Sequence, residues 1–140
     1  MTQQWIIYAL LSAVFAALVA IFGKIGLKNI DSNLATAIRA LVMFLFLFGI
    51  ILFQKKMLLL NTLGFNEYLF IVLAGIAGAL SWLFYFFALK IGDATKVASL
   101  DRLSIVFVMI FALLFLGEKL TLPKATGVVL IIVGALLMIV

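Results

Sequence analysis

The chain has 140 residues, of which 69% are hydrophobic and 11% charged, with a formal net charge of +5 and a mean hydropathy of +1.44. A soluble domain of this size has too much surface for its volume to hide so many apolar side chains, so the composition excludes a soluble domain and predicts a polytopic membrane protein. The chain has no Cys and no His, which excludes disulfides, thiolate metal sites and the commonest near-neutral base.

Five apolar segments are long enough to cross a bilayer, which takes about 20 helical residues. They predict an all-α membrane protein with one transmembrane domain over residues 1–140, because backbone groups in lipid must be bonded internally and no alternating barrel strands are visible. The N-terminus carries no Lys or Arg and no suitable cleavage site follows, so we expect the first segment to stay as a span rather than act as a cleaved signal peptide. The predicted spans cover about residues 5–22, 34–53, 68–89, 94–116 and 123–140.

Local signals mark the ends of these segments. Asp31 and the two residues after it offer capping oxygens to the second span, and Asn66 offers one to the third. Thr121 can cap the fifth span, with Pro123 tolerated in its first turn. The loops are short, so successive helices should be antiparallel neighbours, and the longer segment 55–67 should lie along the membrane interface.

The basic residues of the loops do not favour either orientation of the chain in the membrane. We expect the lysines to anchor the chain at the headgroups rather than to bind nucleic acid. An odd number of spans puts the termini on opposite sides, and the lysines then divide evenly between the sides, so insertion in both orientations (dual topology) is an open alternative to a fixed one. The N-terminal side receives Lys55, Lys56, Lys119 and Lys124, and the opposite side receives Lys24, Lys28, Lys90 and Lys96.

Four charged residues lie in or at the ends of spans near one face of the membrane: Lys24, Arg39, Asp101 and Arg102. Charge inside the bilayer is costly, so such groups normally pair or face a cavity. Asp101 and Arg102 are adjacent and point about 100° apart, so Asp101 needs a partner from another helix, Arg39 being the first choice and Lys24 the second. Two interpretations stay open: a structural ion pair with snorkelling arginines, or a gate or substrate site in a water-filled cavity.

Other candidate residues each have a structural alternative. Trp82 and Tyr85 belong to an aromatic run that could line a solute cavity or form an interface belt. Glu118, in the turn before the last helix, could fix that loop or act at a gate. Gly127 and Gly134 lie on one face of the fifth span, which could pack within the chain or against a second copy. No nucleophile–base set, phosphate loop or metal cluster is visible, so we predict neither an enzyme nor a metal or cofactor site.

Several stretches resemble the EamA-type drug/metabolite transporters. They are residues 87–94, 97–108, 115–121 and 127–135, together with Gly23-Lys24 and Ala37-Ile-Arg39. The resemblance implies one five-helix repeat, whereas many family members carry two such repeats in inverted orientation. An antiparallel homodimer, or a homologous partner chain, would supply the missing half. Small four-span relatives use a glutamate in their first span, which is absent here, so Asp101 as a substitute is a hypothesis.

From these features we predict a multi-pass protein of the cell membrane that moves a small organic solute by alternating access, as a transporter or as half of one. The alternatives are a non-transporting subunit of a larger complex and a flippase for a lipid-linked carrier. The charged cluster favours an anionic or zwitterionic solute, whereas the aromatic run favours a hydrophobic cation. The solute and its energy coupling are left open.

Overall fold

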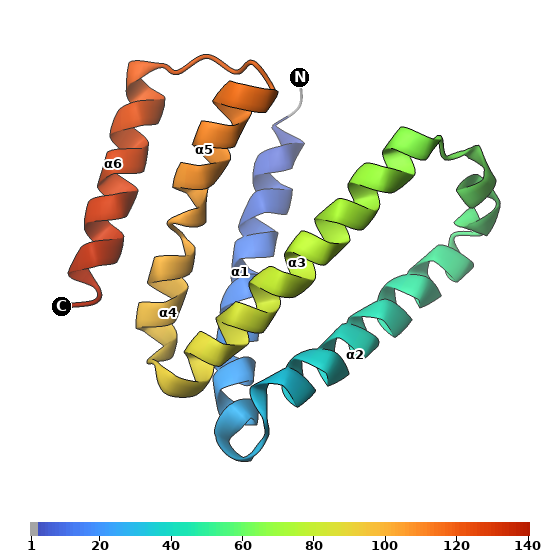
Figure 1. Cartoon of the computed structure of the whole chain (residues 1–140), viewed down its shortest axis with the longest axis horizontal. Coiled ribbons are helices and arrows are strands. Elements are labelled where there is room, and N and C mark those ends of the chain that lie inside the picture. Colours follow the sequence, from blue (N-terminus) through green and yellow to red (C-terminus); the bar gives the residue numbers. More distant parts are fainter. Residues whose placement is uncertain (1–2) are drawn as a thin grey trace. The chain divides into compact units, whose positions relative to one another are not determined.

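A computed structural model describes residues 3–140 (Figure 1), and the described residues form helices and turns without a β-strand. The all-α prediction is therefore confirmed. The chain divides into two compact units, one comprising the N-terminal residues up to Lys24 together with Ile91–Val140, and the other comprising Ile25–Lys90. The elements are α1 (Gln4–Gly26), η1 (Leu27–Asn29), α2 (Ser32–Phe53), η2 (Lys56–Thr62), α3 (Phe65–Ile91), α4 (Ala94–Asp101), α5 (Ser104–Phe115) and α6 (Leu122–Leu137).

In the unit Ile25–Lys90, the helices α2 and α3 are joined by the 3₁₀ helix η2. Asp31 caps α2 as predicted, because its carboxylate accepts hydrogen bonds from the backbone N–H groups of Asn33 and Leu34, at 2.9 and 3.1 Å. The start of α3 differs from the prediction: the helix begins at Phe65, so Asn66 already lies within it, and the Glu67 carboxylate accepts the N–H of Gly64 instead. This is the returning half of a capping box.

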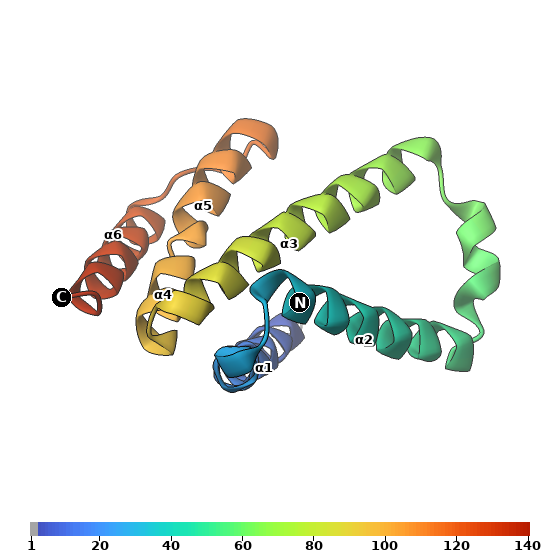
Figure 2. The ribbon, with the colours of Figure 1, turned by 60° about the horizontal axis from the view of Figure 1, so that its bottom comes forward.

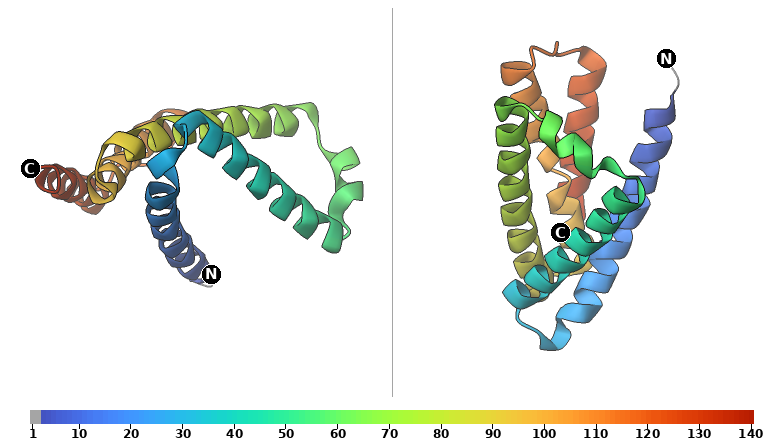
Figure 3. Two further views of the ribbon diagram at one scale, coloured as in Figure 1. Left: turned by 90° about the horizontal axis from the view of Figure 1, so that it is seen from below. Right: turned by 90° about the vertical axis from the view of Figure 1, so that its right-hand side faces the viewer.

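The two long helices of this unit are splayed. They approach each other at the start of α2 and the end of α3, and they diverge towards η2 (Figures 2 and 3). At the closed end, the Lys90 ammonium donates to the carbonyl of Ile30 at 2.7 Å, which ties the end of α3 to the turn before α2. The splay leaves a groove between the helices.

In the other unit, the predicted fourth span is interrupted. It forms α4 and α5, separated by a tight turn at Arg102–Leu103. The N–H groups of Leu103 and Val106 bond to carbonyls three residues earlier, both at 2.9 Å, so the backbone narrows to a 3₁₀ turn. The Ser99 hydroxyl donates to the carbonyl of Thr95 at 2.7 Å, a back-bond that favours bending.

Helix α6 packs beside α4 in the same unit (Figure 1). The Lys96 ammonium donates to the carbonyl of Ile139 at 2.7 Å, and the Ser99 hydroxyl contacts the Met138 sulfur at 3.0 Å. Pro123 lies in the first turn of α6, as predicted. Thr121 occupies the N-cap position, but its side chain makes no capping hydrogen bond.

Four helical segments of the described chain have the length and apolarity to cross a membrane: Gln4–Asn29, Ser32–Phe53, Phe65–Ile91 and Ala94–Phe115. Four of the five predicted spans are thus confirmed. The fifth is shorter than expected, because α6 has 16 residues and ends at Leu137, a rise of about 24 Å against about 30 Å of hydrocarbon. Long apolar side chains along all these helices are exposed, among them Phe46 at 70% and Leu130 at 70%, as suits helices surrounded by lipid.

Candidate functional site

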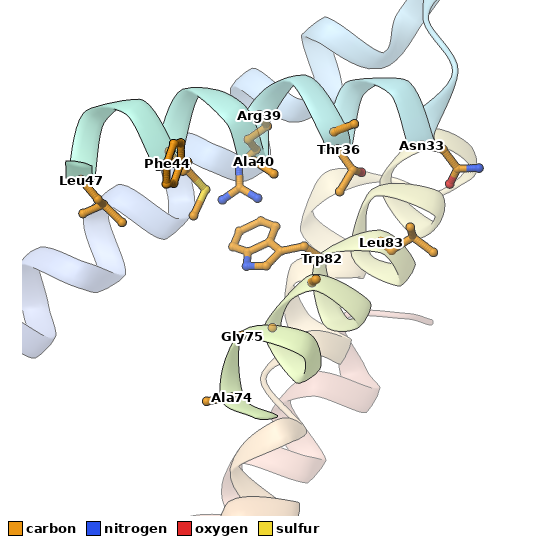
Figure 4. A pocket seen from close by; sticks show the side chains of 14 residues that line it. Asn33, Thr36, Arg39, Ala40, Phe44, Leu47, Ala74, Gly75, Trp82 and Leu83 are labelled. Atoms are coloured by element: carbon orange, nitrogen blue, oxygen red, sulfur yellow. The ribbon is translucent and has the colours of Figure 1, made fainter. Parts of the chain in front are cut away.

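The site is centred on Arg39, about two turns into α2. Its guanidinium lies over the Trp82 ring of α3, with the central carbon 3.4 Å from the ring centroid (Figure 4). The same carbon is 5.4 Å from the centroid of the Phe86 ring. Both distances fall within the range of cation–π attraction, for which an indole ring is the best partner. Arg39 is half-buried. The contact gives a charge inside a membrane segment a favourable neighbour without a carboxylate.

The Trp82 ring is itself held by aromatic neighbours one turn further along α3. Tyr85 and Phe86 meet it edge to face, with centroids 5.5 and 6.0 Å from that of Trp82. Spacings of three and four residues place all three side chains on one helix face. Phe86 is 4% exposed, so the support beneath the tryptophan is buried. This arrangement fixes the indole in the orientation that receives Arg39.

Beside this contact lies a groove of about 790 Å³ between α2 and α3, which we call the Arg39 groove. Asn33 and Thr36 lie towards one end, and Phe44 and Leu47 lie towards the other (Figure 4). Small residues widen it, and a Cβ added at Gly75 or Gly78 would meet no atom within 4 Å. The lining residues are Asn33, Thr36, Ala37, Arg39, Ala40, Met43, Phe44, Leu47, Ala74, Gly75, Gly78, Ala79, Trp82 and Leu83, among which Arg39 alone is charged.

The structure brings together three of the predicted site residues, Arg39, Trp82 and Tyr85, all within the unit Ile25–Lys90. Lys24, Asp101 and Arg102 belong to the other unit. There the Lys24 ammonium donates to the carbonyl of Gly92 at 2.7 Å. Asp101 and Arg102 are exposed, at the end of α4 and in the tight turn that follows it. A single cluster of all four charged residues stays a prediction.

Glu118 has a clear local role in the turn before α6. Its carboxylate pairs with the Lys124 ammonium at 2.9 Å, and both side chains are half exposed. The preceding Gly117 has a φ of +65°, and the N–H of Glu118 bonds to the carbonyl of Ala112 at 3.2 Å, which ties the turn to the end of α5. These bonds fix the loop; a role at a gate stays a prediction.

The glycine face of α6 is open within the described chain. A Cβ at Gly127 or Gly134 would meet nothing within 4 Å. The buried residues of the helix, Val128 and Ala135, each follow one of these glycines and therefore lie about 100° around the axis. The packed face and the glycine face are thus different, and packing of the glycines against a second copy stays a prediction.

Sequence reasoning missed two polar members of the site, Asn33 and Thr36. Together with Arg39 they recur every three residues at the start of α2, which places them along one side of the helix. That spacing was the available signal. Lys90 and Lys96 were counted only as loop charges, although both close helix ends by donating to backbone carbonyls.

The long apolar helices define a multi-pass integral membrane protein, and the Arg39 groove lies between two of them. Residues 3–140 match the EamA-like transporter family, and the chain belongs to that family. The predicted family, membrane location and transporter class are thereby confirmed.

Two relatives are similar over almost their whole length. A protein of a Sinorhizobium species, named as an uncharacterized transporter in the cobO 3′ region, is 48% identical over 138 residues, which cover 99% of this chain and 98% of the relative. An uncharacterized protein of Methanocaldococcus jannaschii is 30% identical over 139 residues, covering 95% of this chain and 94% of the relative. No solved structure gives a significant match.

Proposed function

We propose that the chain is one five-helix half of a secondary transporter that moves a small organic solute by alternating access, with an antiparallel second copy as the other half. The Arg39 groove carries this proposal. It combines one membrane-embedded charge, a fixed aromatic platform and an apolar wall, which is the composition of a ligand site in a membrane protein.

Family membership and the relatives support the proposal in a second way. The chain belongs to a transporter family, and the two relatives align over nearly all of their own lengths, so they too are chains of about this size. In carriers built from inverted repeats, solute binds where the repeats meet. Evenly divided loop lysines allow the two copies to insert in opposite orientations.

The interruption of the fourth span supports a conformational change of that helix during transport. Discontinuous helices are common near the solute sites of secondary transporters, and short 3₁₀ turns within helices are frequent hinge points. In α4–α5 the turn lies at Arg102–Leu103, directly after Asp101. We propose that bending there opens and closes the path.

Flux and orientation test this proposal. Purified protein in liposomes should accelerate the movement of solutes from a broad panel of organic anions and cations over that in empty liposomes. Reporters fused to the C-terminus, one active inside the cell and one outside, should both give signals. If flux occurs but one reporter stays silent, the antiparallel homodimer is wrong and a separate partner chain must supply the second half. If no solute moves, the chain is a non-transporting subunit.

A further inference from the structure

We propose that the Arg39 groove binds an amphiphilic organic acid, with the carboxylate or phosphate on the Arg39 guanidinium and the apolar body along α2 and α3. This inference rests on the proposed transport function and names its substrate class. The groove's charge, the use of its aromatic face, and its size each lead to the same ligand.

The charge of the groove selects an anion. Arg39 is the one charged residue in the lining, so the lining offers a positive group and no carboxylate. Its contacts are with the faces of Trp82 and Phe86. A ring face attracts the positive charge but supplies no lone pairs for the five N–H donors of a guanidinium. A carboxylate or phosphate satisfies both needs, because it neutralises the charge and accepts two parallel hydrogen bonds.

The aromatic residues do not favour a cation, although an aromatic run alone suggests one. Aromatic sites hold cationic ligands by placing the cation over a ring face. Here the guanidinium of Arg39 already lies over the Trp82 face at 3.4 Å. A cationic solute would have to displace it and would meet its charge at close range. The arrangement therefore removes the disagreement between the basic and aromatic features of the sequence in favour of an anion.

The apolar part of the groove selects a ligand with a hydrophobic body. Met43, Phe44 and Leu47 continue the wall on α2 beyond Arg39, and the glycines of α3 leave space opposite. A volume of about 790 Å³ lies in the range of sites for drug-sized ligands. A small hydrophilic anion would leave most of that apolar wall uncovered. An acid with an alkyl or aromatic body would cover it.

Fluorescence of Trp82 gives a direct binding assay. The chain has two tryptophans, so a Trp5→Phe variant leaves Trp82 as the sole reporter in the groove. This variant is placed in phosphatidylcholine nanodiscs and titrated with decyl phosphate, decyltrimethylammonium or decanol, which share one chain and differ in charge. Parallel titrations of empty discs correct for partitioning into lipid. We expect a saturable change with decyl phosphate and affinities about 10-fold or more weaker for the other two probes, as for the loss of a charge-assisted hydrogen bond.

Variants assign the binding to Arg39. Arg39→Gln should weaken decyl phosphate binding by about 10- to 100-fold and abolish the preference for the anion. Lys56→Gln, which removes one exposed charge about 25 Å further along the chain at η2, should leave the affinity unchanged. Gly78→Leu should weaken all three probes by filling the groove, since the added side chain meets open space. If Arg39→Gln loses its helical circular dichroism, Arg39→Lys serves instead and should retain the anion preference.

The source of the acid is separated by changing the lipid. If membrane lipids supply the phosphate, adding phosphatidylglycerol to the discs should shift Trp82 fluorescence before any probe is added and should weaken decyl phosphate binding, both only when Arg39 is present. If a soluble acid is the ligand, phosphatidylglycerol should change neither. Both results support an acid in the groove. Equal binding of the three probes, or unchanged binding in Arg39→Gln, overturns the proposal.

The binding proposal and the transport proposal can be refuted independently of each other. Anion-selective binding without flux of any solute would overturn the transport function and keep the ligand class. Flux of cations by a protein whose groove shows no anion preference would keep transport and overturn the ligand class.

Discussion

The contact between Arg39 and Trp82 should be measurable as an interaction free energy. The guanidinium carbon lies 3.4 Å from the ring centroid, and Arg39 is half-buried, so its environment lies between the exposed and fully desolvated cases. Cation–π pairs contribute about 0.5–1 kcal/mol when exposed and about 2 kcal/mol when desolvated, which places this pair at about 1 kcal/mol. That energy corresponds to about a fivefold change in an unfolding equilibrium.

A double-mutant cycle isolates this energy from the other effects of each substitution. The variants are Arg39→Gln, Trp82→Leu and the pair combined, and reversible unfolding in mixed micelles is followed by circular dichroism as the fraction of denaturing detergent rises. Arg39→Gln alone could raise or lower the free energy of unfolding, because it also removes a charge from a membrane segment. The coupling term does not share that ambiguity. A parallel cycle with Lys56→Gln and Trp82→Leu should be additive within about 0.5 kcal/mol, because Lys56 lies in η2, whereas Trp82 lies about 25 Å along α3 from the helix start that follows η2.

A coupling energy near zero for Arg39 and Trp82, in a protein whose control cycle is additive, would refute the cation–π contact. It would also remove the reasoning by which the Trp82 face is closed to a cationic solute. A coupling of about 1 kcal/mol would support both.

Four further predictions concern the other unit. Gly117→Ala should lower the free energy of unfolding by about 1–2 kcal/mol, because the residue has a φ of +65°. Glu118→Gln should change the free energy of unfolding by less than about 1 kcal/mol, because its ion pair is half exposed. The same detergent titration measures both. Asp101→Asn should abolish pH-driven flux in liposomes while membrane insertion persists, and full activity would remove Asp101 from the mechanism. Gly127→Leu combined with Gly134→Leu should reduce the fraction of dimer that is captured by a chemical crosslinker that does not need cysteine. An undiminished dimer fraction would show that this face is not the interface.

The helices were predictable because hydrocarbon imposes a simple rule. A long apolar segment must be helical, so the second, third and fourth spans were predicted within three residues of their observed ends, whereas the first extends seven residues further than predicted. The errors concern local hydrogen bonds. The third helix starts at Phe65 because Glu67 reaches back to Gly64, a choice that the neighbouring Asn66 concealed. The fourth span is interrupted near Asp101 because polar side chains and i−3 hydrogen bonds tighten its backbone, and hydropathy does not report such bonds.

The sequence singled out Arg39 and Trp82 separately but did not predict the contact between them. Arg39 and Trp82 were each conspicuous as a charge or an aromatic group in a span. Charge arithmetic assigned Arg39 to Asp101, because a membrane arginine is expected to meet a carboxylate. Within the unit Ile25–Lys90, the guanidinium lies over a ring face on α3, which provides electrostatic attraction without formal charge. Its pairing with Asp101, which belongs to the other unit, stays a prediction. Counting charged residues in a sequence finds carboxylate partners but overlooks aromatic ones.

The depth of Arg39 gives the proposed dimer a specific consequence. Arg39 is about 10 Å along the axis from the start of a helix about 33 Å long, and its contact with Trp82 lies at the end of α3 that approaches the same turn. Arg39 is thus nearer one face of the membrane than the other. An inverted second copy would carry its own Arg39 at the same distance from the opposite face. Each side of the membrane would then have one arginine within reach of an entering acid, and neither arginine would lie at the midplane, where its charge costs most. A parallel dimer would place both on one side and leave the other without an anion site, so the asymmetric depth of a single arginine favours the antiparallel assembly.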